Sequence, residues 1–374
     1  MPANKKHHYV PRFYLRNFAS DGRSVNLYNL RQARLVHEAN LKNQCFRDYM
    51  YGKDGQQEHQ LSQLEGGLAP LLRWILDSEQ LPRPFSPDHE AICILTLLQY
   101  ARTAYSADAL DDLADGFWRN VLAKDPRVQP EMLEKVRIGN TDPANLAVSI
   151  MLRHYHLIMD MSFRLLIAHP AREFITSDNP VVFYNQLLEF ERFGASTGLV
   201  HKGLQIFFPL SPRIALMFYD SGVYRVDPPT SILTSIPTMS DMEEINALQV
   251  VAALENVYFA SAKANIFKVV ERGRRFRRAQ KIKMLVMPER KTPTGSSQLI
   301  GGGREDVRTD LSLTFVRLLM PAKRWREERK KPGPKPAVVP RDDRFVKEHE
   351  NFQLLVEQGK YQPTEFVRYL RDRR

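Results

Sequence analysis

The chain has 374 residues, which is enough for one large domain or two ordinary ones and for a substantial core without disulfide or metal support. Its 54 Lys and Arg residues outnumber 43 Asp and Glu residues and give a formal net charge of +11. An excess of that size favours polyanionic partners, nucleic acid first and an anionic membrane surface second, and a basic protein without such a partner is the alternative.

Cysteine usage and the N-terminal residues exclude several classes of protein. Cys45 and Cys93 belong to no CxxC and no Cys/His pair, which argues against structural zinc and against a secreted disulfide scaffold. The first twenty residues lack the apolar region and cleavage site of a signal peptide. The longest apolar run, residues 91–98, is far shorter than the ~20 residues of a membrane span. We therefore expect a cytoplasmic protein without membrane association.

The first half of the chain is predicted to be mainly helical. Residues 24–30 and 34–37 are typical of two short strands around a polar turn. Residues 108–122 favour a helix, and a stripe of apolar residues predicts a long helix over 142–168. His154 falls on that stripe, where it is either a core residue or a ligand.

Two further helices carry the polar residues of most interest. Leucines recur at three- and four-residue steps between residues 55 and 75, with Glu65 on or beside the apolar face. The next helix starts with Ser86 as N-cap and Pro87 at its first position. Arg102 follows its apolar part. A guanidinium at the end of a buried helix meets a carboxylate or a phosphate, so Arg102 is either structurally paired, for example to Glu65, or a ligand-binding residue.

The second half is predicted to mix short strands with one clear helix. Its helix, expected over 240–255 with Ser240 or Asp241 as N-cap, separates the earlier strands from the later ones. The expected strands are residues 173–176, 181–184, 205–210, 214–219, 257–260 and 282–287, with 205–210 and 214–219 as an antiparallel pair.

These patterns predict an α+β fold, with a helical N-terminal half packed against a mixed or antiparallel sheet in the second half and a helical C-terminal tail. The main domain is expected over residues 1–320. Residues 321–343 are basic and proline-rich, which is typical of a linker. Residues 344–374 are expected to form one or two short helices broken at Pro363, a candidate contact for a protein partner.

Four segments resemble one known family. They are HHYVPRFYLRNF at residues 7–18, QYART at 99–103, FITSDNPVVF at 174–183 and FFPLSPRIAL at 207–216. Together, and in this order, they resemble the bacterial DUF4238 family, a domain of unknown function, over about residues 5–290. The resemblance implies no established activity. It does imply which positions matter, and these are His8, Pro11, Tyr14, Leu15, Phe18, Glu65, Arg102, Asp178, Asn179, Pro180 and Pro209.

The polar members of this set, His8, Glu65, Arg102, Asp178 and Asn179, are candidate catalytic residues, because such groups are costly to bury unless they meet one another. A histidine and carboxylates, with His8 and Asp178 as the metal ligands, would hold a divalent ion such as Mg²⁺ or Mn²⁺, and Arg102 would bind a phosphate. That arrangement is a phosphodiesterase site. The alternative is a buried polar network that ties the N-terminal segment to the core.

An HNH nuclease site is a second hypothesis. HHYVP followed by Asn29 and His37 has a tolerable spacing for that motif. The motif needs a helix where residues 34–37 favour a strand, and supporting cysteines are missing, which argues against it.

A basic cluster near residue 275 is the predicted nucleic-acid-binding element. Its members are Arg272, Arg274, Arg275, Arg277, Arg278, Lys281 and Lys283. Arginines around Gly273 and Phe276 would suit phosphate contact together with base stacking, and a solvated helix end is the alternative.

We therefore expect a nucleic-acid-associated protein, with a metal-dependent nuclease as the enzymatic hypothesis. The resemblance implies a defence or mobile-element context. The competing hypothesis is a non-enzymatic interaction module in which the polar set is structural.

Overall fold

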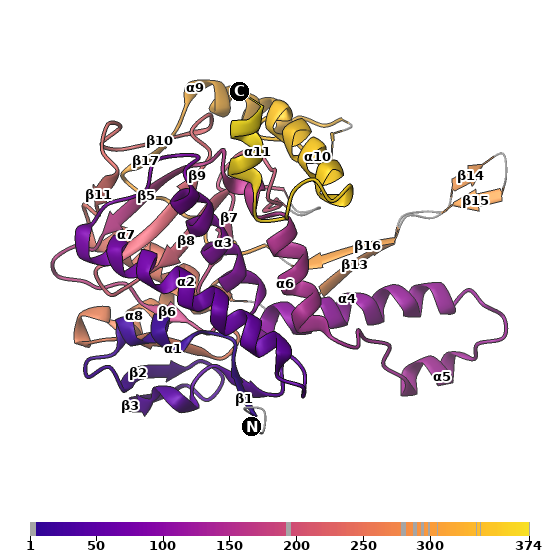
Figure 1. Cartoon of the computed structure of the whole chain (residues 1–374), viewed down its shortest axis with the longest axis horizontal. Coiled ribbons are helices and arrows are strands. Elements are labelled where there is room, and N and C mark those ends of the chain that lie inside the picture. The colour runs from indigo at the N-terminus through magenta and orange to yellow at the C-terminus, as the bar shows by residue number, and fades with distance from the viewer. Residues whose placement is uncertain are drawn as a thin grey trace.

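The computed structural model describes residues 5–191, 196–277, 282–286, 290–292, 295–297, 300–304, 306–333, 335–336 and 338–373. Two sheets and their helices form the body, and an arm built on the outer part of α4 (Ala104–Leu122) and α5 (Pro130–Lys135) projects from it (Figure 1). The predicted α+β class is confirmed.

A five-stranded mixed sheet forms the centre of the body. Its order is β11-β5-β9-β8-β7, and only the β11–β5 pair is parallel. The predicted pair is confirmed as β8 and β9, whose residues are all buried, as their continuous apolar sequences require. The strands are β5 (Ser162–Ile167), β7 (Val182–Tyr184), β8 (Gln205–Pro209), β9 (Ile214–Tyr219) and β11 (Leu233–Ser235).

A four-stranded antiparallel sheet joins the two halves of the chain. The N-terminal hairpin of β2 (Ser24–Asn29) and β3 (Arg34–Asn40) pairs through β2 with β12 (Asn256–Phe259), which pairs with β6 (Thr176–Ser177). The N-terminal segment is fixed to the same region by Tyr14, because its hydroxyl lies 2.6 Å from both Thr176 Oγ1 and the Pro209 carbonyl oxygen.

Shorter pairs of strands complete the β-structure. They are β1 (Lys6–His8) with β4 (Phe46–Asp48), β10 (Tyr224–Val226) with β17 (Val316–Leu318), β13 (Ile282–Val286) with β16 (Ile300–Arg304), and β14 (Arg290–Thr292) with β15 (Gly295–Ser297). β13 falls where a strand over 282–287 was predicted, and it lies with β16 beside α4.

The remaining helices cover the sheets. Ser86 caps α3 as predicted, since its side chain accepts a hydrogen bond from the His89 N–H. The cap of α7 is instead Thr238, one residue before that helix begins. The helices are α1 (Arg12–Leu15), α2 (Gln56–Ser78), α3 (Pro87–Ala101), α6 (Pro143–Arg153), α7 (Met239–Ala252), α8 (Ile266–Arg274), α9 (Met320–Lys330), α10 (Asp343–Glu357) and α11 (Phe366–Asp372).

The long helix predicted over 142–168 is wrong in its second part. α6 ends at Arg153, His154 leaves the helical conformation at φ −118° and ψ 10°, and residues from Ser162 onward form β5. Because β5 pairs with β9 on one side and with β11 on the other, hydrogen bonds within the sheet satisfy the backbone N–H and C=O groups of this apolar segment. Tertiary pairing thus overrides the helical period of the sequence.

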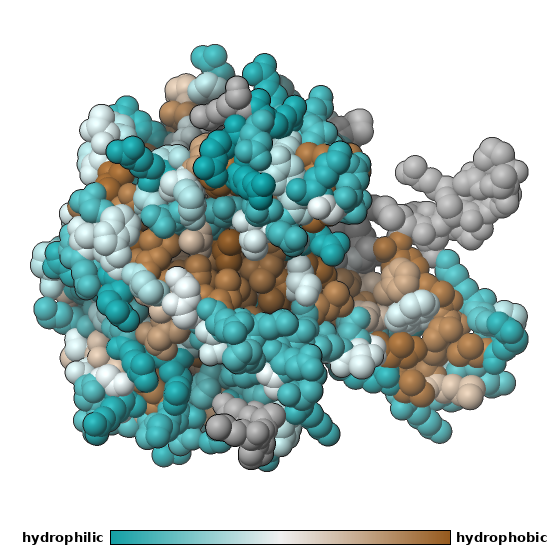
Figure 2. Space-filling model, in the orientation of Figure 1, coloured by the Kyte–Doolittle hydropathy of each residue, from teal (hydrophilic) through white to brown (hydrophobic). Residues whose placement is uncertain are grey.

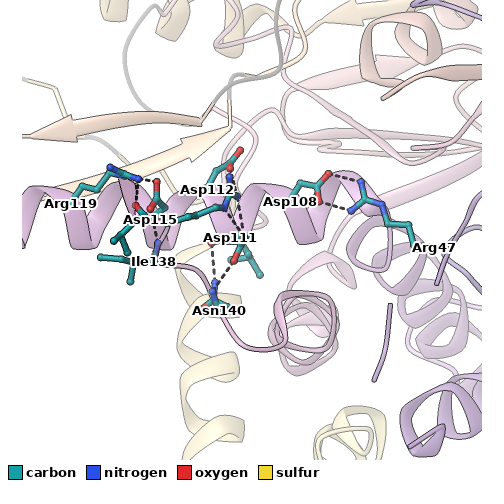
Figure 3. A network of polar contacts seen from close by, with 11 residues as sticks. Arg47, Asp108, Asp111, Asp112, Asp115, Arg119, Ile138 and Asn140 are labelled. Carbon is teal, nitrogen blue, oxygen red and sulfur yellow. Dashed lines mark hydrogen bonds and ion pairs between the residues drawn. The ribbon is translucent and has the colours of Figure 1, made fainter. Parts of the chain in front are cut away.

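The arm is fixed by carboxylates on one face of α4 (Figure 3). Asp115 accepts hydrogen bonds from Arg119 and the Ile138 N–H, and Asp111 accepts from the Asn140 N–H, so the returning segment is tied back to the helix. Apolar side chains remain exposed on the arm (Figure 2), and they are Phe117, Trp118, Val121, Met132 and Val136.

The C-terminal residues are built into the body. The first part of the predicted linker is helical, as α9, and Arg341 near its end pairs with Asp160 at 2.6 Å. Phe352 of α10 and Phe366 and Tyr369 of α11 belong to the main hydrophobic cluster. One or two tail helices were predicted and two are present, but their packing in the core was not predicted.

The tail meets the body at a group of histidines, and we predict that it weakens in acid. His156 is buried and contacts His349 of α10 through its Nε2. Burial lowers the pKa of His156 to about 2 and that of His349 to about 4, and neighbouring histidines add to both effects. The unfolded chain binds these protons near pH ~6.5. Stability is therefore full above that pH and declines as the pH falls toward 4, by up to ~1.4 kcal/mol per pH unit for each histidine.

Urea unfolding followed across this pH range measures the effect. His349→Gln should reduce the slope of unfolding free energy against pH, whereas His59→Gln, at an exposed position of α2, should leave it unchanged. Equal slopes in the two variants would contradict the assignment.

Candidate active site

An open cavity of about 580 Å³ lies between the N-terminal segment, α2 and the end of α3. Cationic side chains and two carboxylates dominate its lining. The lining residues are Lys6, His8, Pro11, Arg12, Phe13, Arg16, Lys42, Asn43, Glu58, Ser62, Glu65 and Arg102. The structure therefore brings together three of the predicted catalytic residues, His8, Glu65 and Arg102.

Helical spacing explains how two local segments supply most of these groups. Arg12 and Arg16 are four residues apart in consecutive helical turns and so lie on one side. Glu58, Ser62 and Glu65 follow at i, i+4 and i+7 along α2, which places them in one row facing the cavity.

Arg102 is the buried floor of the cavity. Its guanidinium forms an ion pair with Glu65 through Nη1, and Nη2 donates to the His8 carbonyl oxygen at 2.7 Å. The Tyr51 hydroxyl donates to the Arg102 carbonyl at 2.8 Å. Within the described residues Arg102 Nε has no hydrogen-bond partner. The predicted Glu65–Arg102 pair is confirmed, and one donor of Arg102 is left over.

His8 lines this cavity, and one of its ring nitrogens has no hydrogen-bond partner. That nitrogen is Nε2, which is buried and without a partner in the described part of the chain. A neutral imidazole carries a lone pair on one of its two nitrogens, and that nitrogen can accept a proton. Burial lowers the pKa of His8, and the charges of Arg12, Arg102 and Lys6 lower it further. His8 is thus held neutral.

The adjacent histidine has a different role. His7 is fully buried, accepts a hydrogen bond from the Tyr51 N–H at its Nδ1 (3.1 Å) and stacks on the Tyr51 ring at 5.8 Å. These contacts fix the N-terminal segment. Of the two histidines, His8 is the one available for chemistry.

Glu58 is the second group with an unused polar atom. Its Oε2 is buried and has no hydrogen-bond partner among the described residues. Burial raises the pKa of Glu58, and Glu65 adds to the rise, while His7 and Arg102 act against it. Glu58 therefore keeps a proton to higher pH than an ordinary glutamate, and that proton is free to be given away.

Three cations at the mouth of the cavity are uncompensated. Arg12, Arg16 and Lys42 form no ion pair with a carboxylate anywhere in the ranges that the structure describes. A second cavity of about 290 Å³ shares all three of these side chains and adds Arg23. The two cavities form a basic groove, which we define by Arg12, Arg16, Arg23 and Lys42.

Asp178 and Asn179 do not line either cavity. Asp178 is almost fully buried and accepts hydrogen bonds from the N–H groups of Leu254, Glu255 and Asn256 at 2.7, 2.7 and 2.8 Å. Asn179 donates to the Ala252 carbonyl at 3.0 Å. Burial raises the pKa of Asp178 to about 6, against the effect of its N–H donors. Both residues hold the turn between α7 and β12, outside the two cavities, and their catalytic role stays a prediction.

The residues predicted to hold a metal do not form a ligand group. Asp178 uses both carboxylate oxygens on backbone N–H groups, and the described residues bring together no group of three His, Cys, Asp or Glu side chains that could hold an ion. The donor set thus does not fit the expected Mg²⁺ or Mn²⁺. Residues 34–37, which an HNH site needs in a helix, lie in strand β3.

A family model described as a protein of unknown function, DUF4238, matches residues 6–263. The chain belongs to the DUF4238 family. No curated protein and no solved structure matches it. The DUF4238 region contains the whole cavity and ends before α8 begins, so β13 to β16 and the tail lie beyond the match. No helix in the described ranges is long and apolar enough to cross a membrane.

The residues of the predicted nucleic-acid-binding cluster lie just beyond the DUF4238 match, and they fall into two groups, one held by intramolecular contacts and one at the surface. Arg277 donates to the carbonyls of Val250, Ala253 and Leu254 and so caps α7. Arg272 pairs with Glu244 at 2.7 Å. These two side chains hold the body together, and their binding of nucleic acid stays a prediction. Arg274 and Arg275 stay at the surface, whereas Arg278, Lys281 and the side chain of Lys283 lie outside the described residues.

Sequence reasoning missed Glu58, Arg12, Arg16 and Lys42. A signal for three of them was present. Glu58 precedes the family position Glu65 by two helical turns, and Arg12 and Arg16 flank the family positions Tyr14 and Leu15 with helical spacing. Lys42 carried no local signal, because only the docking of the β3 end brings it to the cavity.

Proposed function

We propose that this protein binds the phosphate backbone of nucleic acid in the basic groove and cleaves a phosphodiester there, with His8 as general base and Glu58 as general acid. The observation that carries the proposal is that His8 and Glu58 line one cavity and that each has a buried polar atom, Nε2 and Oε2, without a hydrogen-bond partner in the described residues. Their pKa values move in opposite directions, as an acid–base pair requires.

The charges of the groove support a polyanionic substrate. Arg12, Arg16 and Lys42 are shared by both cavities, so they lie where successive phosphates of one strand would pass. Guanidinium groups bind phosphate oxygens with two parallel hydrogen bonds, and the net charge of +11 attracts the strand over longer distances.

The proposed step is balanced between the two groups. His8 Nε2 takes the proton of the attacking hydroxyl or water as its oxygen bonds to phosphorus. The bond from phosphorus to the leaving oxygen breaks, and protonated Glu58 gives its proton to that oxygen. Solvent then carries the proton from His8 back to Glu58. Arg102, which lines the same cavity, would stabilise charge on the phosphate.

Incubation of the full chain with labelled RNA and DNA, with Mg²⁺, with Mn²⁺ and with chelator, tests this function. We expect cleavage that persists in chelator and is lost in His8→Ala. Cleavage only with added metal would overturn the acid–base assignment. Binding without cleavage in any arm would favour the competing hypothesis, a non-enzymatic nucleic-acid-binding module, which the structural roles of Asp178 and Arg277 support.

Glu58→Gln gives a sharper prediction, because glutamine cannot donate a proton to the leaving oxygen. In the unaltered protein the rate should fall in acid because His8 gains a proton, at a pH below the ordinary pKa of histidine. It should fall in base because Glu58 loses its proton, at a pH above the ordinary pKa of glutamate. The pH–rate profile is then bell-shaped. In Glu58→Gln the maximal rate should drop ~10²–10⁴-fold and the alkaline fall should disappear.

A pH–rate profile measures this change. The control is Glu131→Gln, an exposed position on the arm, which should reproduce the original profile. If the rate of Glu58→Gln still falls in base, the alkaline fall belongs to a group other than Glu58.

A further inference from the structure

A third cavity, of about 420 Å³, lies between α8 and strand β2. Its lining is Tyr28, Phe267, Val270, Glu271, Arg274 and Arg275. The volume falls within the ~300–1,000 Å³ of small-molecule sites, and the lining combines aromatic, aliphatic and cationic groups. The proposed chemistry at His8 uses none of these residues.

The two aromatic rings form a corner. Tyr28 and Phe267 stand at 86° with their centroids 6.0 Å apart. Tyr28 is buried and forms the floor, whereas Phe267 is 64% exposed, the most exposed large apolar side chain in the described residues. A ring held in this way offers a free face for stacking.

Two arginines stand beside that corner. Arg274 lies over the Tyr28 ring at 5.7 Å and donates to its hydroxyl at 3.3 Å, and it has no carboxylate partner in the described ranges. Arg275 contacts Glu271 at 3.3 Å in a pair whose side chains are both about 70% exposed. Such a surface ion pair contributes little to stability, so Arg275 can exchange the Glu271 carboxylate for a phosphate.

We propose that this cavity binds an unpaired nucleobase, which stacks on Phe267 while Arg274 and Arg275 hold the adjoining phosphate. The sequence pointed to Phe276 as the stacking ring, but Phe276 is half-buried and Phe267 is exposed. Base–aromatic stacking tolerates any base, and paired bases cannot present a face to it. The site thus selects single strands. This inference deepens the proposed function by naming single-stranded nucleic acid as the ligand, and it rests on that function for its biological role.

Fluorescence anisotropy with labelled oligo(dT) and oligo(U), each about 16 nucleotides long, tests the proposal. Phe267→Ala and Phe267→Leu should each lose about 5- to 150-fold in affinity, which corresponds to ~1–3 kcal/mol of stacking, and Phe267→Trp should restore it. The unaltered protein and the three Phe267 variants should bind a DNA duplex with equal affinity. Because Phe267 is exposed, thermal unfolding should be the same in each variant, which excludes a folding defect.

Unchanged affinity in both Phe267→Ala and Phe267→Leu would overturn the site. An acidic phosphopeptide that competes with oligo(dT) only in proteins with an aromatic residue at 267 would assign the cavity to a peptide instead. A second pair of variants shows separately whether the basic groove binds the strand. If Arg12→Ala/Arg16→Ala leaves single-strand affinity unchanged while Phe267→Ala reduces it, the stacking site stands and the groove does not.

Discussion

Asp178→Ala should lower the free energy of unfolding by about 1.5–4.5 kcal/mol, because its buried carboxylate accepts hydrogen bonds from three partly buried N–H groups and each bond contributes ~0.5–1.5 kcal/mol. The three donors, Leu254, Glu255 and Asn256, form the turn between α7 and β12. Arg277, which caps the same helix end, would also lose the nearby charge of Asp178. Urea unfolding followed by circular dichroism measures the loss.

Asp21→Ala is the matched control. Asp21 also accepts from two backbone N–H groups, those of Arg23 and Ser24, but it is exposed, so water replaces its carboxylate. We expect a loss of less than about 1 kcal/mol there. Equal losses in the two variants would mean that Asp178 does not hold the turn.

His8→Ala should lower kcat for phosphodiester cleavage by ~10²–10⁴-fold while leaving substrate affinity nearly unchanged. The affinity comes from Arg12, Arg16 and Lys42, whereas Nε2 of His8 acts only on the proton that moves. Single-turnover cleavage of labelled RNA and DNA separates the two quantities.

His37→Ala is the control for His8→Ala, since His37 is an exposed histidine of β3. It should cleave like the unaltered protein. A rate for His8→Ala equal to that of His37→Ala would remove His8 from the reaction, and a parallel loss of affinity would make it a binding residue.

Local chemistry made part of this structure predictable. The start of α3 follows from Ser86 and Pro87, because a cap and a proline fix a helix end without distant contacts. The pair of β8 and β9 follows from two apolar runs around a short turn. The Glu65–Arg102 pair follows from the cost of burying a guanidinium alone.

Other features depend on contacts that the sequence does not show. The segment after His154 has a helical period, yet pairing with β9 and β11 makes it a strand. Asp178 lies more than seventy residues from the N–H groups that it binds, so a structural role is invisible from its neighbours. Arg277 looks like part of a basic surface cluster until the carbonyls of α7 take up its donors.

The central claim is that the basic groove binds nucleic-acid phosphates, and the salt dependence of binding tests it most directly. On a single strand, each lost phosphate contact reduces the slope of log affinity against log salt by ~0.7. For labelled oligo(dT), Arg12→Ala/Arg16→Ala should therefore weaken binding and reduce the slope by about 1.4. The charge-matched control Arg73→Ala/Arg83→Ala removes two exposed arginines outside the groove and should change neither quantity. Equal slopes in the two double variants would contradict the account.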